Sequence, residues 1–570
     1  MNGKTTMTMM LLALVSALFL ASAAAADEPM RLHLIWTNDV HGHIAPEPAR
    51  FMNPNFPPPL GGGASLANYV NRVRAEAARR GESVLMVDVG DFFQGTPVGA
   101  KTQGDAVVEY FNAMGYDCIV PGNHDFDLGR ENTMRLSSQT DAPWLCANLR
   151  DESDGEIVDW CRPTLIIERG GLKIGCIGII TTGTVAMSFP QNIAGLIFDP
   201  MLPAIEKYRD ELLAQGVDLI ALLIHEGLPY DPEAGWKLII SGEDADSDQQ
   251  DAQGGGYGYV QGGSLNLMEI ANAVEGIDFA VGGHTHRGYD EPWIDPMTHT
   301  MCFESYGNGS SVGHAILLVD RPTGSLVGYE TPHDRGTLIT LFEDELWPEE
   351  TMRRTLEPYI EEAEAAMNTV VGSSAVNLTR GGPGSNLEGN VVTDAMREYF
   401  DADFSFQNLG GLRADVPSGD ITAKDVFSIL PFGNELVIVQ MRGEMIRHIV
   451  ERKVRGDSGG ICISGAKIVF NKNRPNLDRV CELLIGGEPL DPERVYHVVC
   501  TSFLMEGNSG LDFLTTIPAA DINLTQITTA ESVEHYLKLH SPIRPRIDDR
   551  WVENPRATQK PYLKQSGDLP

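Results

Sequence analysis

Beyond its first 26 residues, the sequence has no apolar run long enough to cross a lipid bilayer. No membrane-spanning anchor is therefore expected. Residues 7–20 form one short apolar stretch, which Lys4 precedes and small alanines follow at residues 24–26. This order is typical of a secretory signal peptide. No cysteine follows the stretch, so a lipid anchor is not expected either, and we predict a periplasmic or extracellular protein.

Positive charge is scarce. The 570 residues include 43 Lys and Arg against 79 Asp and Glu, which gives a formal net charge of −36. A protein that binds nucleic-acid polymers needs basic surface to neutralise phosphates, so this balance argues against such a partner. The acidity itself fits an ordinary acidic exported protein and says nothing about the fold.

Cysteine pairs with metal-binding C-x-x-C spacing are also missing, although the sequence has eight cysteines. Five lie before residue 303 and three after residue 461, so disulfides confined to each part would leave one cysteine over in both. Export permits disulfides, and Cys462 with Cys481 is a candidate cross-strand pair. Several cysteines lie within Val, Ile and Leu runs, where we expect buried, reduced side chains.

The length predicts more than one domain. Apolar strands alternate with helical patterns from about residue 31 to 334, and again from about 370 to 551, which predicts two α/β domains. Between them, residues 343–367 have helical spacing without glycine, and we expect a long exposed helix. The predicted parts are a signal peptide (1–26), a first domain (27–335), a linker helix (336–369), a second domain (370–552) and a polar tail (553–570).

Five short islands of Asp, Asn and His follow apolar runs in the first domain, as loops do at the ends of buried strands. Any one of these residues alone could be structural, but their joint occurrence favours a metal centre. Carboxylate, amide and imidazole groups suit hard or borderline divalent ions, and there are enough for two ions sharing one carboxylate. The candidate ligands are Asp39, His41, Asp91, Asn123, His225, His284 and His286.

Four of the islands form motifs: D-x-H-G at residues 39–42, G-D-F-F-Q-G at 90–95, G-N-H-D-F-D at 122–127 and G-H-T-H at 283–286. Together they resemble the motifs of metallophosphoesterases, and more narrowly those of the exported 5′-nucleotidase and UDP-sugar hydrolase family. The resemblance covers nearly the whole mature chain. It implies an N-terminal four-layer αββα sandwich, a linker helix and a C-terminal α/β substrate-binding domain.

The resemblance also implies a role for each motif residue. One divalent ion, zinc or manganese, would bind the first of two ligand sets, and Asp91 would bridge to the second ion. His124, oriented by Asp127, would stabilise charge on the phosphoryl group and the leaving oxygen. The two terminal ligand sets would be Asp39, His41 and His286 for the first ion, and Asn123, His225 and His284 for the second.

In the second domain, residues 408–413 (N-L-G-G-L-R) resemble the family loop that holds substrate phosphate or ribose, which implies roles for Asn408 and Arg413. Arg380 is a further candidate for phosphate binding. Phe432 and Phe503 match the positions of two aromatic rings that stack on a nucleobase. One departure is Ser509, which stands where the family has an aspartate for the ribose hydroxyls; a serine accepts a hydrogen bond without the charge-assisted strength of a carboxylate.

The expected function is release of phosphate from nucleoside 5′-monophosphates, with nucleoside diphosphates and UDP-sugars as further candidate substrates. One alternative is hydrolysis of 2′,3′-cyclic nucleotides or of a sulfur ester on the same scaffold. The other is a non-catalytic nucleotide-binding or surface protein, against which the His124–Asp127 pair argues. The sequence leaves open the metal identity, the oligomeric state and the role of an acidic insert at residues 241–251.

Overall fold

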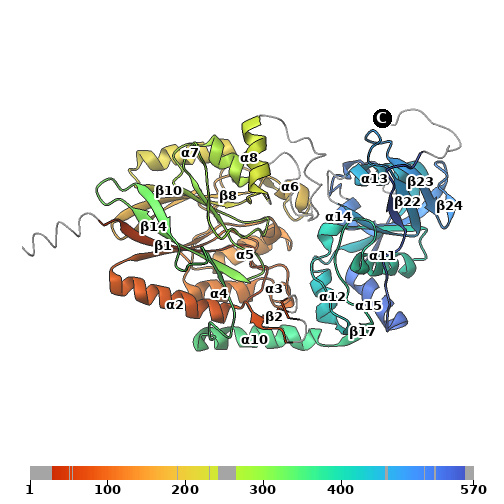
Figure 1. The fold of residues 1–570 in the computed structure, drawn as a ribbon, viewed down its shortest axis with the longest axis horizontal. Coiled ribbons are helices and arrows are strands. Elements are labelled where there is room, and N and C mark those ends of the chain that lie inside the picture. Colours follow the sequence, from red (N-terminus) through yellow and green to blue (C-terminus); the bar gives the residue numbers. More distant parts are fainter. Residues whose placement is uncertain are drawn as a thin grey trace, which may run out of the picture.

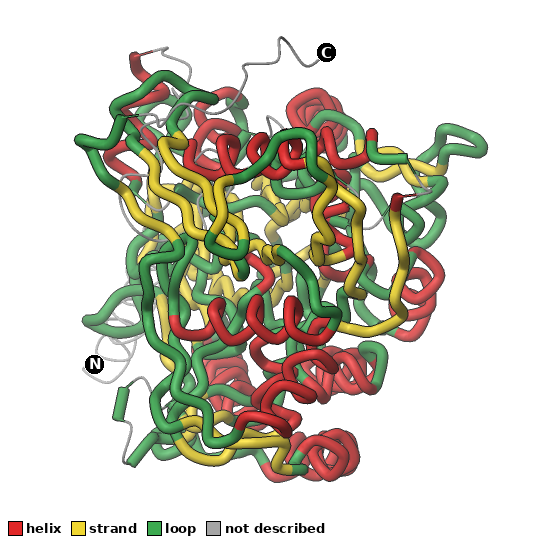
Figure 2. The backbone as a smooth tube through the Cα atoms, turned by 90° about the vertical axis from the view of Figure 1, so that its right-hand side faces the viewer, coloured by secondary structure: helices red, strands yellow, loops and turns green. Residues whose placement is uncertain are grey.

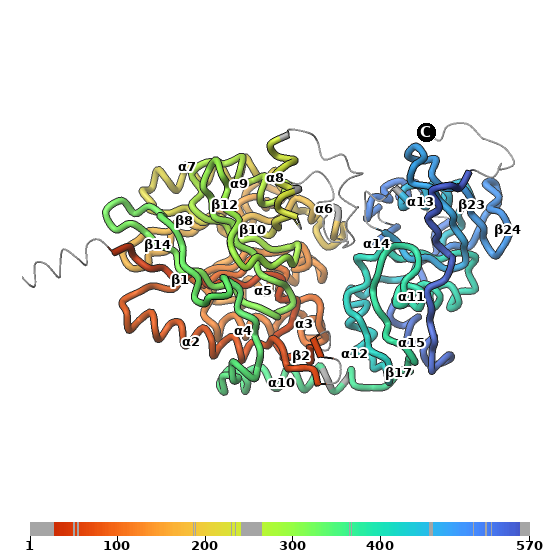
Figure 3. Tube along the Cα trace, viewed as in Figure 1, coloured from red at the N-terminus to blue at the C-terminus, as the bar shows by residue number. Residues whose placement is uncertain are grey.

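The computed structural model describes residues 28–558 except 50–51, 54–55, 189, 230, 242–264, 456–459, 506 and 519–520. The predicted signal peptide, the acidic insert beyond Ser241 and the end of the tail lie outside these residues. The chain forms two domains that follow each other in sequence, and it crosses between them once, after helix α10 (Glu350–Met367) (Figure 1; Figure 3). Among the described residues, no helix combines the length and the apolar character needed to span a bilayer.

The first domain is built on two six-stranded sheets. The first sheet has β1 (Met30–Thr37) at its centre, paired in parallel with β4 and antiparallel with β14. Their apolar residues face both ways, as expected of strands covered on two sides. The other strands of this sheet and their bounds are β4 (Ser83–Asp88), β5 (Cys118–Ile119), β14 (Ser311–Val319), β15 (Leu326–Glu330) and β16 (Leu338–Thr340).

The second sheet stacks on the first, and the core between them includes Leu34 and Trp36 from one sheet and Leu223 and Phe279 from the other. Strands β8, β10, β11 and β13 run parallel, so their carboxyl ends lie at one edge. In pairing order the strands are β12 (Trp293–Ile294), β13 (Met301–Glu304), β11 (Phe279–Gly282), β10 (Leu219–His225), β8 (Leu172–Ile180) and β7 (Thr164–Arg169).

Helices cover the outer face of each sheet, and Figure 1 shows them above and below the strands of this domain. Figure 2 views the molecule from the side of the second domain, where red helices also flank yellow strands. Helices α2 (Gly63–Arg80), α4 (Asp105–Met114), α5 (Arg130–Gln139) and α10 pack on the first sheet. Helices α7 (Met201–Ala214), α8 (Pro232–Ser241) and α9 (Leu267–Ala273) pack on the second. The predicted four-layer αββα sandwich is therefore confirmed.

The predicted linker helix differs from the structure in two ways. Helix α10 begins at Glu350 rather than at residue 343, because Phe342 bridges to Leu60 and residues 343–345 form a turn, with Leu346 N donating to the Phe342 carbonyl. The helix is also not exposed all round, since Met352, Leu356 and Ala363 are buried against the helices of the first domain. Their spacings of four and seven residues place them on one face, so the charged residues cover only the opposite face.

The second domain has a five-stranded sheet between two cores. Helices α11 (Leu387–Tyr399), α12 (Ala423–Ile429) and α15 (Thr529–His540) cover one face, and α13 (Gly443–Arg455) with a small four-stranded sheet covers the other. Helix α12 begins with a capping box, in which the Thr422 side chain accepts from Asp425 N. The main sheet consists of β21 (Ile461–Ser464), β18 (Phe404–Asn408), β25 (Val495–Thr501), β20 (Glu435–Arg442) and β26 (Ile522–Thr528); the small one of β24 (Glu488–Pro489), β23 (Val480–Ile485), β22 (Ala466–Phe470) and β27 (Trp551–Glu553).

The proposed disulfide between Cys462 and Cys481 is wrong. All eight cysteines are buried and unpaired. Cys462 lies on β21 of the five-stranded sheet and Cys481 on β23 of the four-stranded sheet, so they do not face each other across neighbouring strands. The prediction of buried cysteines within the strands holds instead, and they pack as small apolar side chains.

Candidate active site

The five islands meet at one edge of the sandwich. Strands β1, β4 and β5 of the first sheet run parallel, as do β10 and β11 of the second. Parallel strands end at a common edge, so the loops that follow them converge there. His225 is the last residue of β10, and the other candidate ligands lie in the loops just after β1, β4, β5 and β11.

The backbone at these loops is unusual. Five of the candidate ligands are non-glycine residues with left-handed φ angles between 49° and 72°: Asp39, His41, Asp91, His284 and His286. Such residues cost free energy and persist where the surrounding structure holds them, most often at functional sites. Gly90 shows how tightly the loops approach, because a Cβ there would lie 2.4 Å from Gly122 N.

The convergence produces two compact groups of ligand atoms, Asp39 with His41 and His286, and Asp91 with His225 and His284. In the first group, His286 Nε2 lies 3.3 Å from Asp39 Oδ1 and 3.1 Å from His41 Nε2. In the second, His225 Nε2 lies 3.2 Å from Asp91 Oδ2.

Two further distances connect the groups. Asp91 Oδ2 is also 3.8 Å from His41 Nε2, so this carboxylate lies between the groups. Asn123 Oδ1 lies 3.2 Å from His225 Nε2, which adds a neutral oxygen to the second group.

Two of the candidate histidine ligands are oriented as metal ligands require. The Nδ1–H of His41 donates to the Gln94 carbonyl at 2.6 Å, and the Nδ1–H of His225 donates to the Val89 carbonyl at 2.7 Å. These bonds fix the tautomer and leave each Nε2 lone pair directed into the site. Nitrogen and oxygen donors in this orientation fit zinc or manganese.

His124 and Asp127 form the predicted pair. The Nδ1–H of His124 donates to Asp127 Oδ2 at 2.8 Å, and its backbone N–H donates to Asp91 Oδ1 at 2.7 Å. Burial lowers the pKa of His124, but the carboxylates of Asp127 and Asp91 more than offset it, so the pKa lies above its ordinary value. The pair therefore favours a protonated imidazole beside the ligand groups.

Two buried carboxylates that the sequence analysis did not select hold the ligand loops. Asp125 accepts hydrogen bonds from Asp91 N, Phe92 N and Gly122 N at 2.7 to 3.0 Å. Asp125 could have been found from its place inside the 122–127 motif.

Glu304, at the end of β13, is the second of these carboxylates. It accepts from Leu228 N at 2.7 Å and from Thr285 Oγ1 at 2.5 Å, and so ties the loop after His225 to the loop of His284. It also follows an apolar strand, as the islands do.

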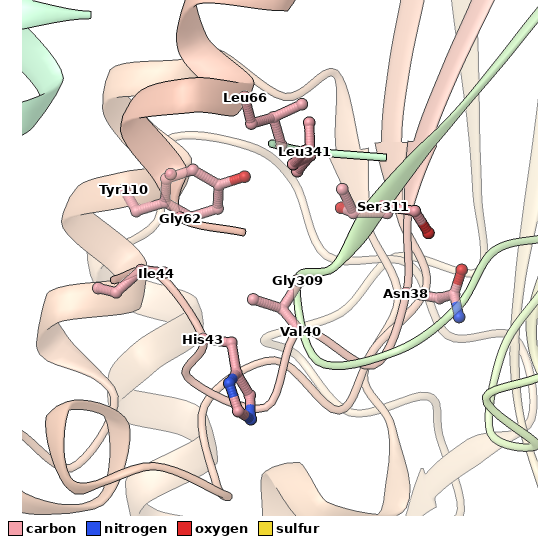
Figure 4. Close-up of a pocket in the computed structure, with 12 residues that line it drawn as sticks. Asn38, Val40, His43, Ile44, Gly62, Leu66, Tyr110, Gly309, Ser311 and Leu341 are labelled. Atoms are coloured by element: carbon pink, nitrogen blue, oxygen red, sulfur yellow. The ribbon is translucent and has the colours of Figure 1, made fainter. Parts of the chain in front are cut away.

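Asp88 and His43 lie beside the ligands without joining either group. Asp88 accepts from Gly90 N at 2.9 Å and so supports the turn before Asp91. His43 lines a cavity of about 10 Å³ together with Asn38, Val40 and Tyr110 (Figure 4). That volume matches one water molecule, so a substrate does not bind there.

The second domain contributes two of its predicted residues to this edge. The Phe432 ring stacks on the His124 imidazole with 5.0 Å between ring centroids and 15° between planes. The Arg413 guanidinium lies 5.4 Å from the Phe432 centroid. Its charge lowers the pKa of both His124 and Asp127, but by less than burial or their mutual pairing shifts those pKa values.

The other predicted substrate residues make the following contacts within the second domain. Arg380 Nε lies 3.2 Å from Asp415 Oδ1, and Asn408 Oδ1 accepts from Gln407 Nε2 at 2.9 Å. Phe503 is half-buried and packs against the core of the second domain. Ser509 is buried with φ of 57°, and its carbonyl accepts from Lys453 Nζ.

The comparisons agree with this geometry. Residues 32–288 match the calcineurin-like phosphoesterase family, and residues 370–516 match the 5′-nucleotidase C-terminal domain. The chain is 26% identical to a 5′-nucleotidase of Vibrio parahaemolyticus, with 91% of each chain covered. It is 24% identical to the endonuclease YhcR of Bacillus subtilis over 86% of its own length, and spans 39% of that protein.

Among solved structures, the 5′-nucleotidase precursor of Thermus thermophilus superposes with a TM-score of 0.76 at 25% identity, covering 93% of this chain and all of the other. The fold and site therefore define a metal-dependent phosphoesterase. More narrowly, the chain belongs to the 5′-nucleotidase family that joins a calcineurin-like phosphoesterase domain to a 5′-nucleotidase C-terminal domain. The fold implies divalent metal ions at the site.

Proposed function

We propose that this protein releases phosphate from nucleoside 5′-monophosphates at a centre of two divalent metal ions. One observation carries the proposal: Phe432 of the second domain stacks on His124 of the first, and Arg413 lies against the Phe432 ring. A guanidinium recognises phosphate, and an aromatic ring recognises a base. Both groups stand beside residues able to assist phosphoester cleavage.

Each ion would be held by one ligand group, the first by Asp39, His41 and His286, the second by Asn123, His225 and His284, with Asp91 shared. When bound, two divalent ions supply Lewis-acid charge that activates a water molecule and neutralises the phosphoryl oxygens. Zinc and manganese both suit this donor set.

Side chains of the protein would donate the proton to the leaving group and stabilise its charge. Asp127 accepts from Nδ1–H of His124, so the opposite nitrogen, Nε2, is the one able to hold a proton toward the leaving oxygen. Arg413 adds positive charge on the same side, which opposes the unfavourable field of an acidic protein around an anionic substrate. Phe432 covers one face of the imidazole and excludes water from it.

Substrate selection belongs to the second domain in this proposal. Asn408 and Arg380 would hold phosphate or ribose, and Phe432 with Phe503 would stack on the base. Ser509 offers a hydroxyl where a carboxylate would bind ribose more strongly, so we expect modest nucleoside discrimination. We also expect nucleoside diphosphates and UDP-sugars to be accepted as secondary substrates.

The test is a substrate panel. The purified protein, loaded with manganese or zinc, is assayed on AMP, ADP, UDP-glucose, 2′,3′-cyclic AMP and a thiosulfate ester, beside an Asp91→Asn control that removes the shared carboxylate. Phosphate release from AMP that is fastest in the panel and lost in the control supports the proposal. Faster turnover of the cyclic nucleotide or of the sulfur ester overturns it.

We further propose that the protein is exported. The support is sequence alone: Lys4, the apolar residues 7–20 and the small residues before Asp27. N-terminal sequencing of protein recovered from the periplasm or the medium tests it. A cytoplasmic product that retains Met1 contradicts it.

A further inference from the structure

Gln94 links the two domains directly. Its side-chain Nε2 donates to the Pro431 carbonyl at 2.7 Å, across 337 positions of the sequence. The side chain is only 5% exposed, so this bond is made away from bulk water. Its Oε1 has no hydrogen-bond partner in the part of the chain that the structure describes. The hydrogen bond to Pro431 is therefore the contact that orients the Gln94 side-chain amide.

The hydrogen bond between Gln94 and Pro431 is one of a ring of contacts around the candidate active site. The Gln94 carbonyl accepts from His41 at 2.6 Å, and its side chain binds Pro431. The next residue, Phe432, stacks on His124, and the His124 ring lies 5.5 Å from the His41 ring. One residue thus connects a candidate metal ligand to the aromatic ring that covers the candidate proton donor.

The geometry of the stack indicates what Phe432 does in this arrangement. A nucleobase between the two rings would need two stacking separations, whereas the centroids are 5.0 Å apart, the distance of a single stacked pair. Phe432 therefore contacts His124 itself. A ring on the imidazole face leaves the in-plane nitrogens accessible, so it restricts the tilt of His124 without blocking Nε2.

We propose that Gln94 is a positioning residue that docks Phe432 on His124, so that the second domain takes part in hydrolysis of any phosphoester and not only in recognising nucleotides. This inference rests on the proposed function for the role of His124, but not for the identity of the substrate. The inference predicts that substitution of Gln94 also slows hydrolysis of a small ester, which has no nucleoside for the second domain to bind.

The experiment compares p-nitrophenyl phosphate with AMP on the full-length, metal-loaded enzyme. Gln94→Leu keeps the side-chain volume and removes the amide donor, and Phe432→Ala removes the ring. Loss of one buried hydrogen bond predicts a roughly threefold to tenfold fall in kcat on both substrates for Gln94→Leu. Bound metal should stay at the wild-type level, and Gln215→Leu, an exposed change at the end of α7, should have no effect.

The double variant decides whether Gln94 acts through Phe432. We expect Gln94→Leu with Phe432→Ala to be no slower on p-nitrophenyl phosphate than Phe432→Ala alone. Multiplying effects, lost metal in Gln94→Leu, or a defect confined to AMP would overturn the inference. If AMP is not hydrolysed but the small ester is, and the coupling holds, the nucleotide proposal fails while this inference stands.

Discussion

Glu388 should make the second domain less stable as pH rises. It lies in the first turn of α11, is fully buried, and neither carboxylate oxygen has a partner among the described residues. Burial raises its pKa to about 9, against an ordinary 4.5, with Arg380 lowering it and Asp415 raising it to lesser extents. The folded protein therefore keeps a proton that the unfolded chain releases above pH 4.5.

The direction and size of the pH effect on stability follow from the difference between the folded and the unfolded pKa of Glu388. A raised folded pKa means that stability is greatest below the unfolded pKa and falls as pH rises toward the folded one. At pH 7.5, three units above the ordinary pKa of 4.5, the free energy of unfolding is lower by about 4 kcal/mol, at 1.36 kcal/mol per pH unit. Glu388→Gln is neutral at every pH and nearly the same shape, so it should recover most of that energy.

Calorimetry of the full-length protein at pH 5 and pH 7.5 measures the effect. We expect Glu388→Gln to change the Tm of the second domain little at pH 5 and to raise it by about 10 °C at pH 7.5. Glu488→Gln, an exposed change on β24, should do neither. An equal shift at both pH values would refute the reasoning, because Glu388 would then ionise as readily in the folded protein as in the unfolded chain.

Three further outcomes are expected. Asp127→Asn should lower kcat on AMP by about 100-fold with little change in KM or bound metal, because the amide lacks the negative charge that favours protonated His124; a change in KM alone would contradict this. Glu304→Leu should weaken manganese binding, measured calorimetrically, by about 10-fold or more, since it ties two ligand loops together; unchanged affinity would show that the loops hold themselves. Ser509→Asp should lower KM for AMP but not for p-nitrophenyl phosphate, because aspartate tolerates the left-handed φ of 57° and adds a charged acceptor. Equal KM changes on both substrates would assign Ser509 to the phosphate instead.

The sequence predicted the strands and the candidate ligand residues because both leave local signals, whereas the division of the ligands into two sets came from the family resemblance. Apolar runs marked β1, β4, β10 and β11, and their polar ends marked the loops that the structure gathers into two groups. The four-layer architecture came from the family resemblance. The capping box of Thr422 and Asp425 lies within four residues, so it too was visible.

Contacts between segments distant in the chain could not be predicted from the sequence. The bond from Gln94 to Pro431 depends on how two domains meet, which no local pattern encodes. The Cys462–Cys481 pairing failed because two apolar strands close in sequence were taken for neighbours when they belong to different sheets. The helix before the second domain was placed too early because residues 343–346, which form a turn and a bend, are acidic and lack glycine as the helix does.

The position of β14 and α10 sets the length of a first domain that could fold alone. The calcineurin-like match ends at residue 288, yet β14 pairs along the whole of β1, and α10 closes the helical layer beneath that sheet. A fragment cut at 288 would expose the edge of β1 and the apolar face of α2, and should aggregate. The first sandwich cannot complete its core until the chain is available for folding as far as Met367, which is nearly two thirds of its length.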